Sequence, residues 1–285
     1  MDRIDLHAHT NRSDGTLEPW ALVAAAKSCG LRALAVTDHD TTAALSSARE
    51  AGRSLGVEVL PGIEITTRFP GRAMHVLAYG FDEHHRGLLA MLEEIVGHRD
   101  GRNLRILAKL ATMGCPLTIE EVHDLAAGDV VARPHIAQAM VRRGYVPDVR
   151  TAFSMYLKDG GPAYEAAEAV EPAEAIAMVH EAGGVAVVAH PRQLRLADAA
   201  AARALFADLV AVGLDGIEVQ HPSHHADDRA LFASIAKAHG LLETGGSDFH
   251  GESKPDIRLG VGDGSVHVTW ETWEAVRDRC ARSRG

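Results

Sequence analysis

The chain has too few cysteines for a disulfide framework or a cysteine zinc site. Its 285 residues include only Cys29, Cys115 and Cys280, which are widely spaced and form no CxxC pair. Disulfide-stabilised domains and zinc ribbons need paired, closely spaced cysteines. Both classes are therefore excluded, and we expect the thiols to be reduced.

Long apolar runs and an excess of positive charge are also missing. No window of about 18 apolar residues occurs, and the sequence opens on a strand pattern rather than on a signal-peptide pattern. We therefore expect a cytoplasmic protein without a membrane partner. The net charge of −10 argues against binding of long duplex nucleic acid, so phosphate binding is expected to be local.

Aromatic residues are scarce, whereas histidine is abundant. The chain has six Phe, four Tyr and three Trp against 17 His, and 46% of its residues are hydrophobic, which is enough for a full core. A histidine excess in an acidic protein is typical of a site for several metal ions, but a histidine-rich surface tract gives the same composition. The positions of the histidines distinguish the two.

Short apolar runs alternate with longer helical patterns along most of the chain. This alternation predicts an α/β fold built from parallel βαβ units. Two predicted strands, residues 57–67 and 73–81, follow each other without room for a helix between them. Residues from about 85 to 156 have a nearly continuous helical pattern, which we interpret as a helical insertion.

The first predicted strand ends in IDLHAHT, with two histidines separated by one residue. Residues i and i+2 of a strand lie on one face, so His7 and His9 point together and can chelate a cation. For this motif alone, hydrogen-bonded histidines without a metal are an equally good explanation.

Other residues of metal-binding types recur at the C-terminal ends of predicted strands. Besides His7 and His9, they are Asp38, His39, Glu64, His190, Asp248 and His250, and His75 lies within the fourth predicted strand. In barrels and open parallel sheets this edge carries the active site, because the loops that leave it converge. The shared position of these residues at strand ends favours one metal centre over scattered surface histidines.

The order and spacing of six motifs resemble those of a known superfamily. IDLHAHTNRSDG, VTDHD, PGIE, MHVLAY, VAHP and GSDFH are similar to motifs of the polymerase and histidinol phosphatase (PHP) superfamily of metal-dependent phosphoesterases. The segments ARPHIAQAMVRRGYV, AFSMYL and GPAY resemble the branch that includes nucleoside 3′,5′-bisphosphate phosphatases and 5′-to-3′ exoribonucleases. The resemblance implies a distorted (β/α)7 barrel formed by residues 1–84 and 165–285, with residues 85–164 as a helical insertion that caps the substrate.

The resemblance also implies a centre of three divalent metal ions. The implied ligands form three sets, with Glu64 bridging the first two: His7, His9, Glu64 and Asp248; His75 and His190; and Asp14, His39 and His250. Imidazole and carboxylate together suit Mn, Fe or Zn better than Ca or Mg. We expect Asp248, Glu64 and His190 to act at the reacting phosphate, which is attacked by a hydroxide that bridges two metals.

The implied substrate contacts lie on the insertion and after a later strand. Arg133 and His135 stand at the start of a predicted helix, where the N–H groups and the dipole favour an anion such as a second phosphate. His224 occupies a position where relatives carry a polar substrate contact. GGPAY at residues 160–164 replaces the GKPAY common among relatives, and Lys158 is close enough to substitute.

Several other polar residues are expected to be structural. Asp40 is predicted to cap a helix that begins at residue 41 or 42, although it or Asp38 could instead orient the ring of His39. His221 is expected to be no more than a neighbour of the site. Four cations recur at helical spacing, which predicts a solvated helix face: Arg99, Arg102, Arg105 and Lys109.

These features predict hydrolysis of phosphate from nucleoside 3′,5′-bisphosphates, or from the 5′ ends of short oligoribonucleotides. Three alternatives remain: a phosphatase for histidinol phosphate or another small ester, a metal-dependent amidohydrolase, and a non-catalytic PHP module. The insertion argues against the first alternative, and Glu64 and His75 as ligands of further metals argue against the second. The complete ligand set argues against the third. No feature predicts the oligomeric state.

Overall fold

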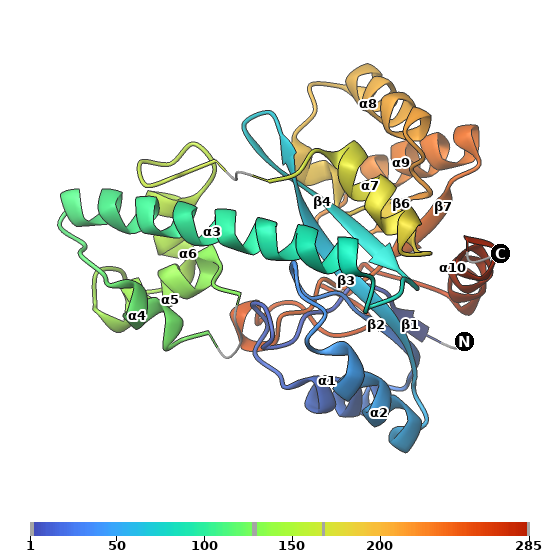
Figure 1. The fold of residues 1–285 in the computed structure, drawn as a ribbon, viewed down its shortest axis with the longest axis horizontal. Coiled ribbons are helices and arrows are strands. Elements are labelled where there is room, and N and C mark those ends of the chain that lie inside the picture. The colour runs from blue at the N-terminus through green and yellow to red at the C-terminus, as the bar shows by residue number, and fades with distance from the viewer. Residues whose placement is uncertain (1–2, 127–129, 167–168, 284–285) are drawn as a thin grey trace.

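A computed structural model describes residues 3–126, 130–166 and 169–283. Within these residues, seven strands form one sheet in which spatial order follows chain order (Figure 1). The strands are β1 (Arg3–Asp5), β2 (Leu31–Val36), β3 (Glu58–Phe69), β4 (Arg72–Tyr79), β5 (Val185–Val188), β6 (Gly216–Gln220) and β7 (Leu242–Gly245). Each strand overlaps an apolar run that predicts it, although β3 extends to Phe69 and β4 begins at Arg72, so the α/β fold class is confirmed.

The sheet is mostly parallel, with one antiparallel interruption. β3 and β4 pair antiparallel, as do β4 and β5, whereas the pairs β1–β2, β2–β3, β5–β6 and β6–β7 are parallel. The two strands predicted without a helix between them therefore form a hairpin. Its turn contains Gly71, whose φ of 74° lies in the left-handed region that glycine adopts without steric cost.

The two edges of the sheet meet through the segments that follow β1 and β7. β1 and β7 do not form a regular strand pair with each other, so the sheet is open. Beyond them, the N–H of His9 donates to the carbonyl oxygen of Phe249 at 2.9 Å, and the N–H of Asp248 donates to the carbonyl oxygen of His7 at 2.9 Å. These bonds join the segments beyond the first and last strands without closing the sheet.

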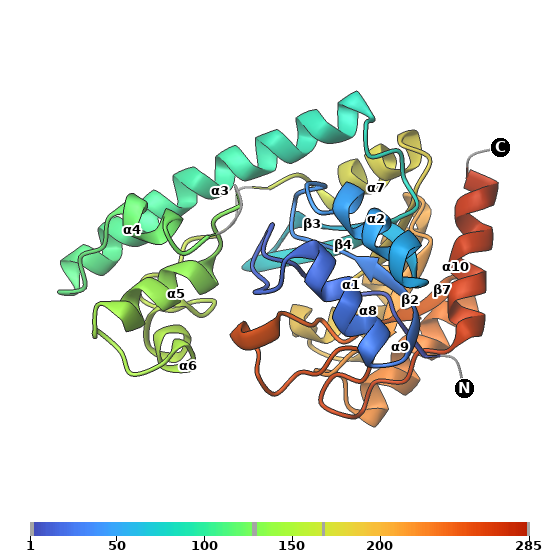
Figure 2. The ribbon, with the colours of Figure 1, turned by 90° about the horizontal axis from the view of Figure 1, so that it is seen from below.

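Helices surround the sheet and form a separate layer beside it (Figures 1 and 2). The α-helices are α1 (Pro19–Ser28), α2 (Leu45–Leu55), α3 (Arg86–Thr112), α4 (Ile119–His123), α5 (Arg133–Arg142), α6 (Val149–Ala152), α7 (Pro172–Glu181), α8 (Ala199–Ala211), α9 (Ala226–His239) and α10 (Trp270–Ser283). A π-helical turn, η1 (Phe153–Leu157), and two 3₁₀ turns, η2 (Pro191–Leu194) and η3 (Gly251–Ser253), complete them. In the described part of the chain, no helix is long and apolar enough to cross a membrane.

Side chains along the strands alternate between two apolar clusters. The inner cluster contains Ala33 and Ala35 from β2 and Leu77 and Tyr79 from β4, and Trp273 of α10 packs with them. The outer cluster contains the intervening residues of the same strands, which pack against α1, α2, α7, α8 and α9. This alternation follows from the two-residue period of a strand, and it leaves polar residues of the inner rows free to form a site.

The long helix α3 belongs to two cores. Leu88 and Met91, near its start, pack in the outer cluster of the sheet. Ile106 and Leu110, near its end, pack in a third cluster with residues of α4, α5 and α6. Figure 2 shows α3 running from the sheet to these three helices. The core of the sheet therefore gives way to the core of the helical layer within α3, and not at the first residue of this helix.

Candidate metal centre

The site lies at one end of the strands, where the side chains that face the inner cluster become polar. Along β4, His75 and Tyr79 point to the same side, and the thiol of Cys280 in α10 contacts the carbonyl oxygen of Tyr79. His75 therefore lies at the other end of the row. Glu64 belongs to the adjacent strand β3, which continues to Phe69. The prediction that Glu64 ends its strand is thus wrong, because β3 runs on into the hairpin.

The first ligand cluster joins the two ends of the sheet. Its members are His7, His9, Glu64 and Asp248, all buried, whose ligand atoms lie within 4.8 Å of one another. Oε2 of Glu64 lies 3.0 Å from Nε2 of His7 and 3.2 Å from Nε2 of His9. Oδ1 of Asp248 lies 3.3 Å from the same nitrogen of His9. The two histidines of IDLHAHT therefore point together, as their spacing predicts.

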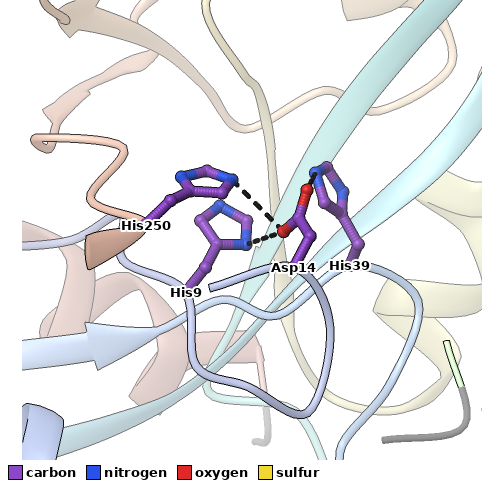
Figure 3. A group of neighbouring side chains, drawn as sticks. All are labelled: His9, Asp14, His39 and His250. Carbon is purple, nitrogen blue, oxygen red and sulfur yellow. Dashed lines mark ion pairs between the residues drawn. The ribbon is translucent and has the colours of Figure 1, made fainter. Parts of the chain in front are cut away.

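The second cluster contains His9, Asp14, His39 and His250. Figure 3 shows the carboxylate of Asp14 between the three imidazole rings. Its Oδ1 lies 3.2 Å from Nε2 of His250 and 3.7 Å from Nδ1 of His9, and its Oδ2 lies 3.9 Å from Nε2 of His39. His9 is thus shared with the first cluster, through its other ring nitrogen.

The third cluster contains His39, Glu64 and His75. Oε1 of Glu64 lies 2.7 Å from Nδ1 of His75 and 2.8 Å from Nε2 of His190. Glu64 therefore takes part in two clusters with different oxygens, which is the geometry of a bridging carboxylate. All nine residues implied as ligands lie in one connected group.

Several imidazole nitrogens in this group have no hydrogen-bond partner. Both ring nitrogens of His9 and Nδ1 of His39 are buried and make no hydrogen bond within the described residues. Buried polar atoms are almost always hydrogen-bonded, so unpaired ones need an explanation. Cation binding explains them, because a neutral imidazole nitrogen is a metal ligand.

The carboxylates and imidazoles shift one another's protonation. Burial alone would raise the pKa of Glu64, but the imidazoles of His39 and His7 hold it well below its ordinary value. Burial alone would lower the pKa of His9, yet the neighbouring carboxylates of Asp248 and Glu64 raise it to about 9. The carboxylates are thus ionised at neutral pH, as ligands of cations must be.

Three residues at the metal centre have strained backbone conformations. Asp40, His190 and Asp248 have φ values of 53°, 28° and 52°, which non-glycine residues rarely adopt. Strain of this kind persists where surrounding contacts enforce it, and it occurs often at functional sites. Here it fixes the direction of two ligand candidates and of their neighbour Asp40.

Two charged residues at the centre are absent from the sequence motifs. Oε1 of Glu218 in β6 lies 2.9 Å from Nδ1 of His7, and its Oε2 accepts the backbone N–H of His190 at 2.7 Å. Nζ of Lys254 donates to Oδ2 of Asp248 at 2.7 Å. His221, expected to be only a neighbour, also reaches this oxygen, at 3.4 Å. A glutamate within an apolar strand pattern gives no sequence signal for this role.

A central pocket of about 260 Å³ opens above the clusters and is strongly cationic on one side. Besides ligand candidates, Arg99, Arg102, Arg133, Phe153 and Lys254 line it. Arg99 and Arg102 are only 7% and 8% exposed, so the prediction that they form a solvated helix face is wrong. Their helical spacing is real, but α3 turns that face toward the site.

The two buried arginines differ in their partners. Arg99 pairs with Asp40 and donates to Oγ1 of Thr66 at 3.0 Å. Arg102 makes no ion pair within the described residues: its Nη2 donates to the neutral Oδ1 of Asn103 at 3.3 Å, and its buried Nε has no hydrogen bond. Burial lowers the pKa of Arg102 to about 9, so it remains charged at neutral pH. A buried cation without a counter-charge is costly, which makes Arg102 suited to bind an anion.

The four residues expected to contact substrate have different surroundings. Arg133 lines the central pocket and is bonded to Oδ1 of Asp159 at 3.0 Å. In the described part of the chain, the lining of this pocket does not include His135, His224 or Lys158. Nδ1 of His135 accepts the N–H of Ala132 at the start of α5.

His224 is buried, whereas Lys158 is exposed. His224 is 2% exposed, and its Nδ1 bonds the carbonyl oxygen of Val219 at 2.9 Å. Burial lowers its pKa to about 4, so its ring is neutral at physiological pH. Lys158 is exposed and follows the π-helical turn η1. The lysine nearest to the clusters is instead Lys254.

Asp38 bonds a loop residue and Asp40 bonds a strand residue, and neither caps a helix. Asp38 accepts the N–H and hydroxyl of Thr10 at 2.7 and 2.6 Å. Asp40 accepts the N–H and hydroxyl of Thr66 at 2.6 and 2.8 Å, and α2 begins only at Leu45. The prediction that Asp40 caps this helix is therefore wrong, because its carboxylate is used by β3 and by Arg99.

Comparisons with known proteins agree with this site. Residues 5–98 match the PHP domain family. Over 290 residues the chain is 34% identical to the 3′,5′-nucleoside bisphosphate phosphatase of Chromobacterium violaceum, with 99% of each chain covered. It is 36% identical over 248 residues to a 5′-3′ exoribonuclease of Haemophilus influenzae, covering 87% of this chain and 90% of that one.

A solved structure shares the fold over the same extent. It comes from Bifidobacterium adolescentis and is assigned to the metal-dependent phosphoesterases. Its TM-score is 0.87 at 33% identity, with 98% of this chain and 96% of that chain covered. An α/β fold with imidazole–carboxylate clusters at one end of its sheet is typical of metal-dependent hydrolases. The chain belongs to the PHP family, and it is a metal-dependent phosphoric ester hydrolase.

Proposed function

We propose that this enzyme removes phosphate from nucleoside 3′,5′-bisphosphates and cleaves the 5′ end of short oligoribonucleotides. The observation that carries the proposal is Arg102, a buried cation that makes no ion pair within the described residues and lines the same pocket as the ligand clusters. A substrate with two phosphates satisfies both features, because one phosphate lies at the clusters while the other neutralises Arg102. The relatives named for bisphosphates and for RNA support this substrate class.

We propose that nine residues hold three divalent ions of Mn, Fe or Zn. They are His7, His9, Asp14, His39, Glu64, His75, His190, Asp248 and His250. Their mixture of imidazole nitrogen and carboxylate oxygen, with buried unpaired nitrogens among them, fits these metals. When bound, such ions supply an activated water and stabilise the charge that develops on the phosphoryl oxygens.

The chain's own residues orient the reacting phosphate. Lys254 lies beside Asp248 and lines the pocket, so its ammonium group stabilises negative charge near the clusters. Glu64, His190 and Asp248 act at the phosphate from fixed positions: His190 is held by its contact with Glu64, and Asp248 is held by its ion pair with Lys254.

The nucleoside is proposed to lie under the helical layer formed by residues 85–164. Phe153 is the one Phe, Tyr or Trp among the described residues that line the central pocket. An aromatic ring in a charged pocket suits stacking against a nucleobase. Arg133, on the same side, is the further cation for the second phosphate. This arrangement disfavours small esters such as histidinol phosphate, which lack both a base and a second phosphate.

Steady-state kinetics test the proposal. Purified protein with Mn²⁺ is assayed for phosphate release from adenosine 3′,5′-bisphosphate and from histidinol phosphate. We expect Arg102→Gln to raise KM for the bisphosphate by about 10- to 100-fold, the worth of one or two hydrogen bonds to a charged group. Arg105→Gln, one turn further along α3 and exposed, is the matched control. Equal turnover of both substrates, or equal effects of both variants, contradicts the proposal.

A further inference from the structure

A second and larger cavity adjoins the central pocket. It has a volume of about 730 Å³ and is bordered by η2 and by the first halves of α8 and α9. Gln193 lines both this side cavity and the central pocket. Asp159, in the wall of the side cavity, bonds Arg133, in the wall of the central pocket, at 3.0 Å. The two spaces are therefore neighbours.

The two proposed reactions need different amounts of space. A nucleoside 3′,5′-bisphosphate and the 5′-phosphorylated end of an RNA contain the same atoms up to the 3′ phosphate. The RNA differs because a second nucleotide is esterified to that phosphate. An enzyme that accepts both must bind the shared part in one place and hold the second nucleotide in an adjoining one. Of the two neighbouring spaces, the central pocket is the smaller, at about 260 Å³, and the side cavity offers the adjoining room, at about 730 Å³.

We propose that the side cavity binds the second nucleotide of a 5′-phosphorylated oligoribonucleotide while the first occupies the central pocket. This inference rests on the proposed function. In the reaction, the oxygen of water bonds to phosphorus and the bond from phosphorus to O3′ of the first nucleotide breaks. O3′ takes up a proton, and the phosphate stays on O5′ of the second nucleotide. The product in the side cavity is therefore again 5′-phosphorylated.

The lining of the side cavity suits a nucleotide. Leu196, Leu231 and Phe232 provide an apolar surface for a base. Of the three carboxylates in the lining, Asp228 pairs with Arg192, Asp159 pairs with Arg133, and Asp198 accepts the N–H of Ala201 at the start of α8. Arg195 is exposed and has no ion pair within the described residues, which leaves it available to a phosphate.

Backbone strain also marks this cavity. Arg195 has a φ of 50°, and it is the one non-glycine residue with positive φ outside the metal centre in the described part of the chain. Its neighbour Arg192 is fixed by Asp228, and the carbonyl oxygen of Gln193 accepts a hydrogen bond from Arg72 at 3.0 Å. The turn that presents Arg195 is therefore held from two sides.

A cavity-filling variant tests the inference. Ala199 lines the side cavity at the exposed start of α8, so Ala199→Trp occupies the space without removing core contacts. Ala200→Trp is the matched control, because this neighbour is also exposed and does not line the cavity. Both variants carry the same helix-propensity cost. Rates are measured with adenosine 3′,5′-bisphosphate and with 5′-phosphorylated diadenylate.

We expect Ala199→Trp to lower kcat/KM for the dinucleotide by about tenfold or more, through steric exclusion, and to leave the bisphosphate rate within about twofold. Arg195→Gln should raise KM for the dinucleotide alone, by about tenfold. Equal losses with both substrates, or no loss with the dinucleotide, overturn the inference. If the wild-type enzyme cleaves neither substrate, the proposed function itself fails, which is a separate outcome.

Discussion

Glu218 illustrates how a single buried carboxylate prepares a metal ligand. Its Oε1 faces Nδ1 of His7 at 2.9 Å, which places the proton of a neutral imidazole on Nδ1 and leaves Nε2 free to bind a cation. The same carboxylate accepts the backbone N–H of His190. One residue thus orients two ligand candidates, which follow strands β1 and β5.

Replacing this carboxylate should weaken metal binding. We expect Glu218→Gln to lower the affinity for Mn²⁺ by about 10- to 100-fold, because the amide offers one acceptor oxygen where two are needed. Isothermal titration of metal-free protein measures the change. Glu243→Gln, on the exposed side of β7, serves as the control. An unchanged affinity in the first variant contradicts the positioning role of Glu218.

The residues of the centre differ in how visible they are in sequence. His7, His9, Asp248 and His250 stand in short motifs at strand ends, where polar residues interrupt apolar runs. Glu218 lies inside such a run, so no local pattern reveals it. Arg102 shows only that one helix face is cationic; whether that face meets water or a pocket depends on packing between α3 and the sheet, which local spacing does not encode.

At the scale of elements, the hydrogen-bonded pair of His180 and Asp215 links α7, β5 and α10 at the start of β6. Nε2 of His180, in the last turn of α7, lies 2.8 Å from Oδ2 of Asp215, which precedes β6. Asp215 also accepts the N–H of Ala186 in β5 and pairs with Arg279 of α10. The hydrogen bond with Asp215 raises the pKa of His180, partly offset by burial.

This raised pKa predicts a pH dependence of stability. Because the folded pKa of His180 lies above the unfolded value, its contribution is fully present below about pH 6.5 and is lost as pH rises through the folded pKa. His180→Asn should therefore lower the free energy of unfolding more at pH 6 than at pH 9. The side chain is 36% exposed, so the difference should stay below about 1 kcal/mol.

Urea unfolding at the two pH values measures this difference. His239→Asn, at the exposed end of α9, is the control. Titration of the metal centre affects wild type and variant alike and cancels in the comparison. The same loss of stability at both pH values contradicts the role assigned to the protonated imidazole.

The boundaries of elements were harder to predict than their existence. The hairpin of β3 and β4 follows directly from two strand patterns with no room for a helix. The start of α2 does not follow from Asp40, because this aspartate resembles a helix cap in sequence while its oxygens bond Thr66. A short polar side chain satisfies a local or a distant donor equally well, and only the fold decides between them.

At the scale of the whole molecule, the helical layer and the sheet are tied together through one buried charge pair. Arg99 of α3 pairs with Asp40, which follows β2, and both bond Thr66 of β3. Arg99 is 7% exposed and Asp40 is 2% exposed. The sequence predicts the helical insertion, but this long-range contact is not readable from periodicity, since the partners are separated by three other elements.

A double-mutant cycle measures this link. Arg99→Met leaves a buried carboxylate without its partner, and Asp40→Asn leaves a buried guanidinium without its own, so each should cost about 3–5 kcal/mol. Asn also tolerates the positive φ of this position, which limits backbone effects. The double variant removes both charges. It should therefore lose less stability than the sum of the single changes, by about 0.5–3 kcal/mol.

Urea unfolding of all four proteins in one metal-free buffer gives the coupling energy. Strict additivity would mean that α3 is held against the sheet by its apolar contacts alone, with the charges acting independently. A positive coupling means instead that the layer bearing Arg102 and Phe153 is locked onto the sheet by the same residues that shape the pocket. Substrate recognition and the attachment of the helical layer would then depend on one interaction.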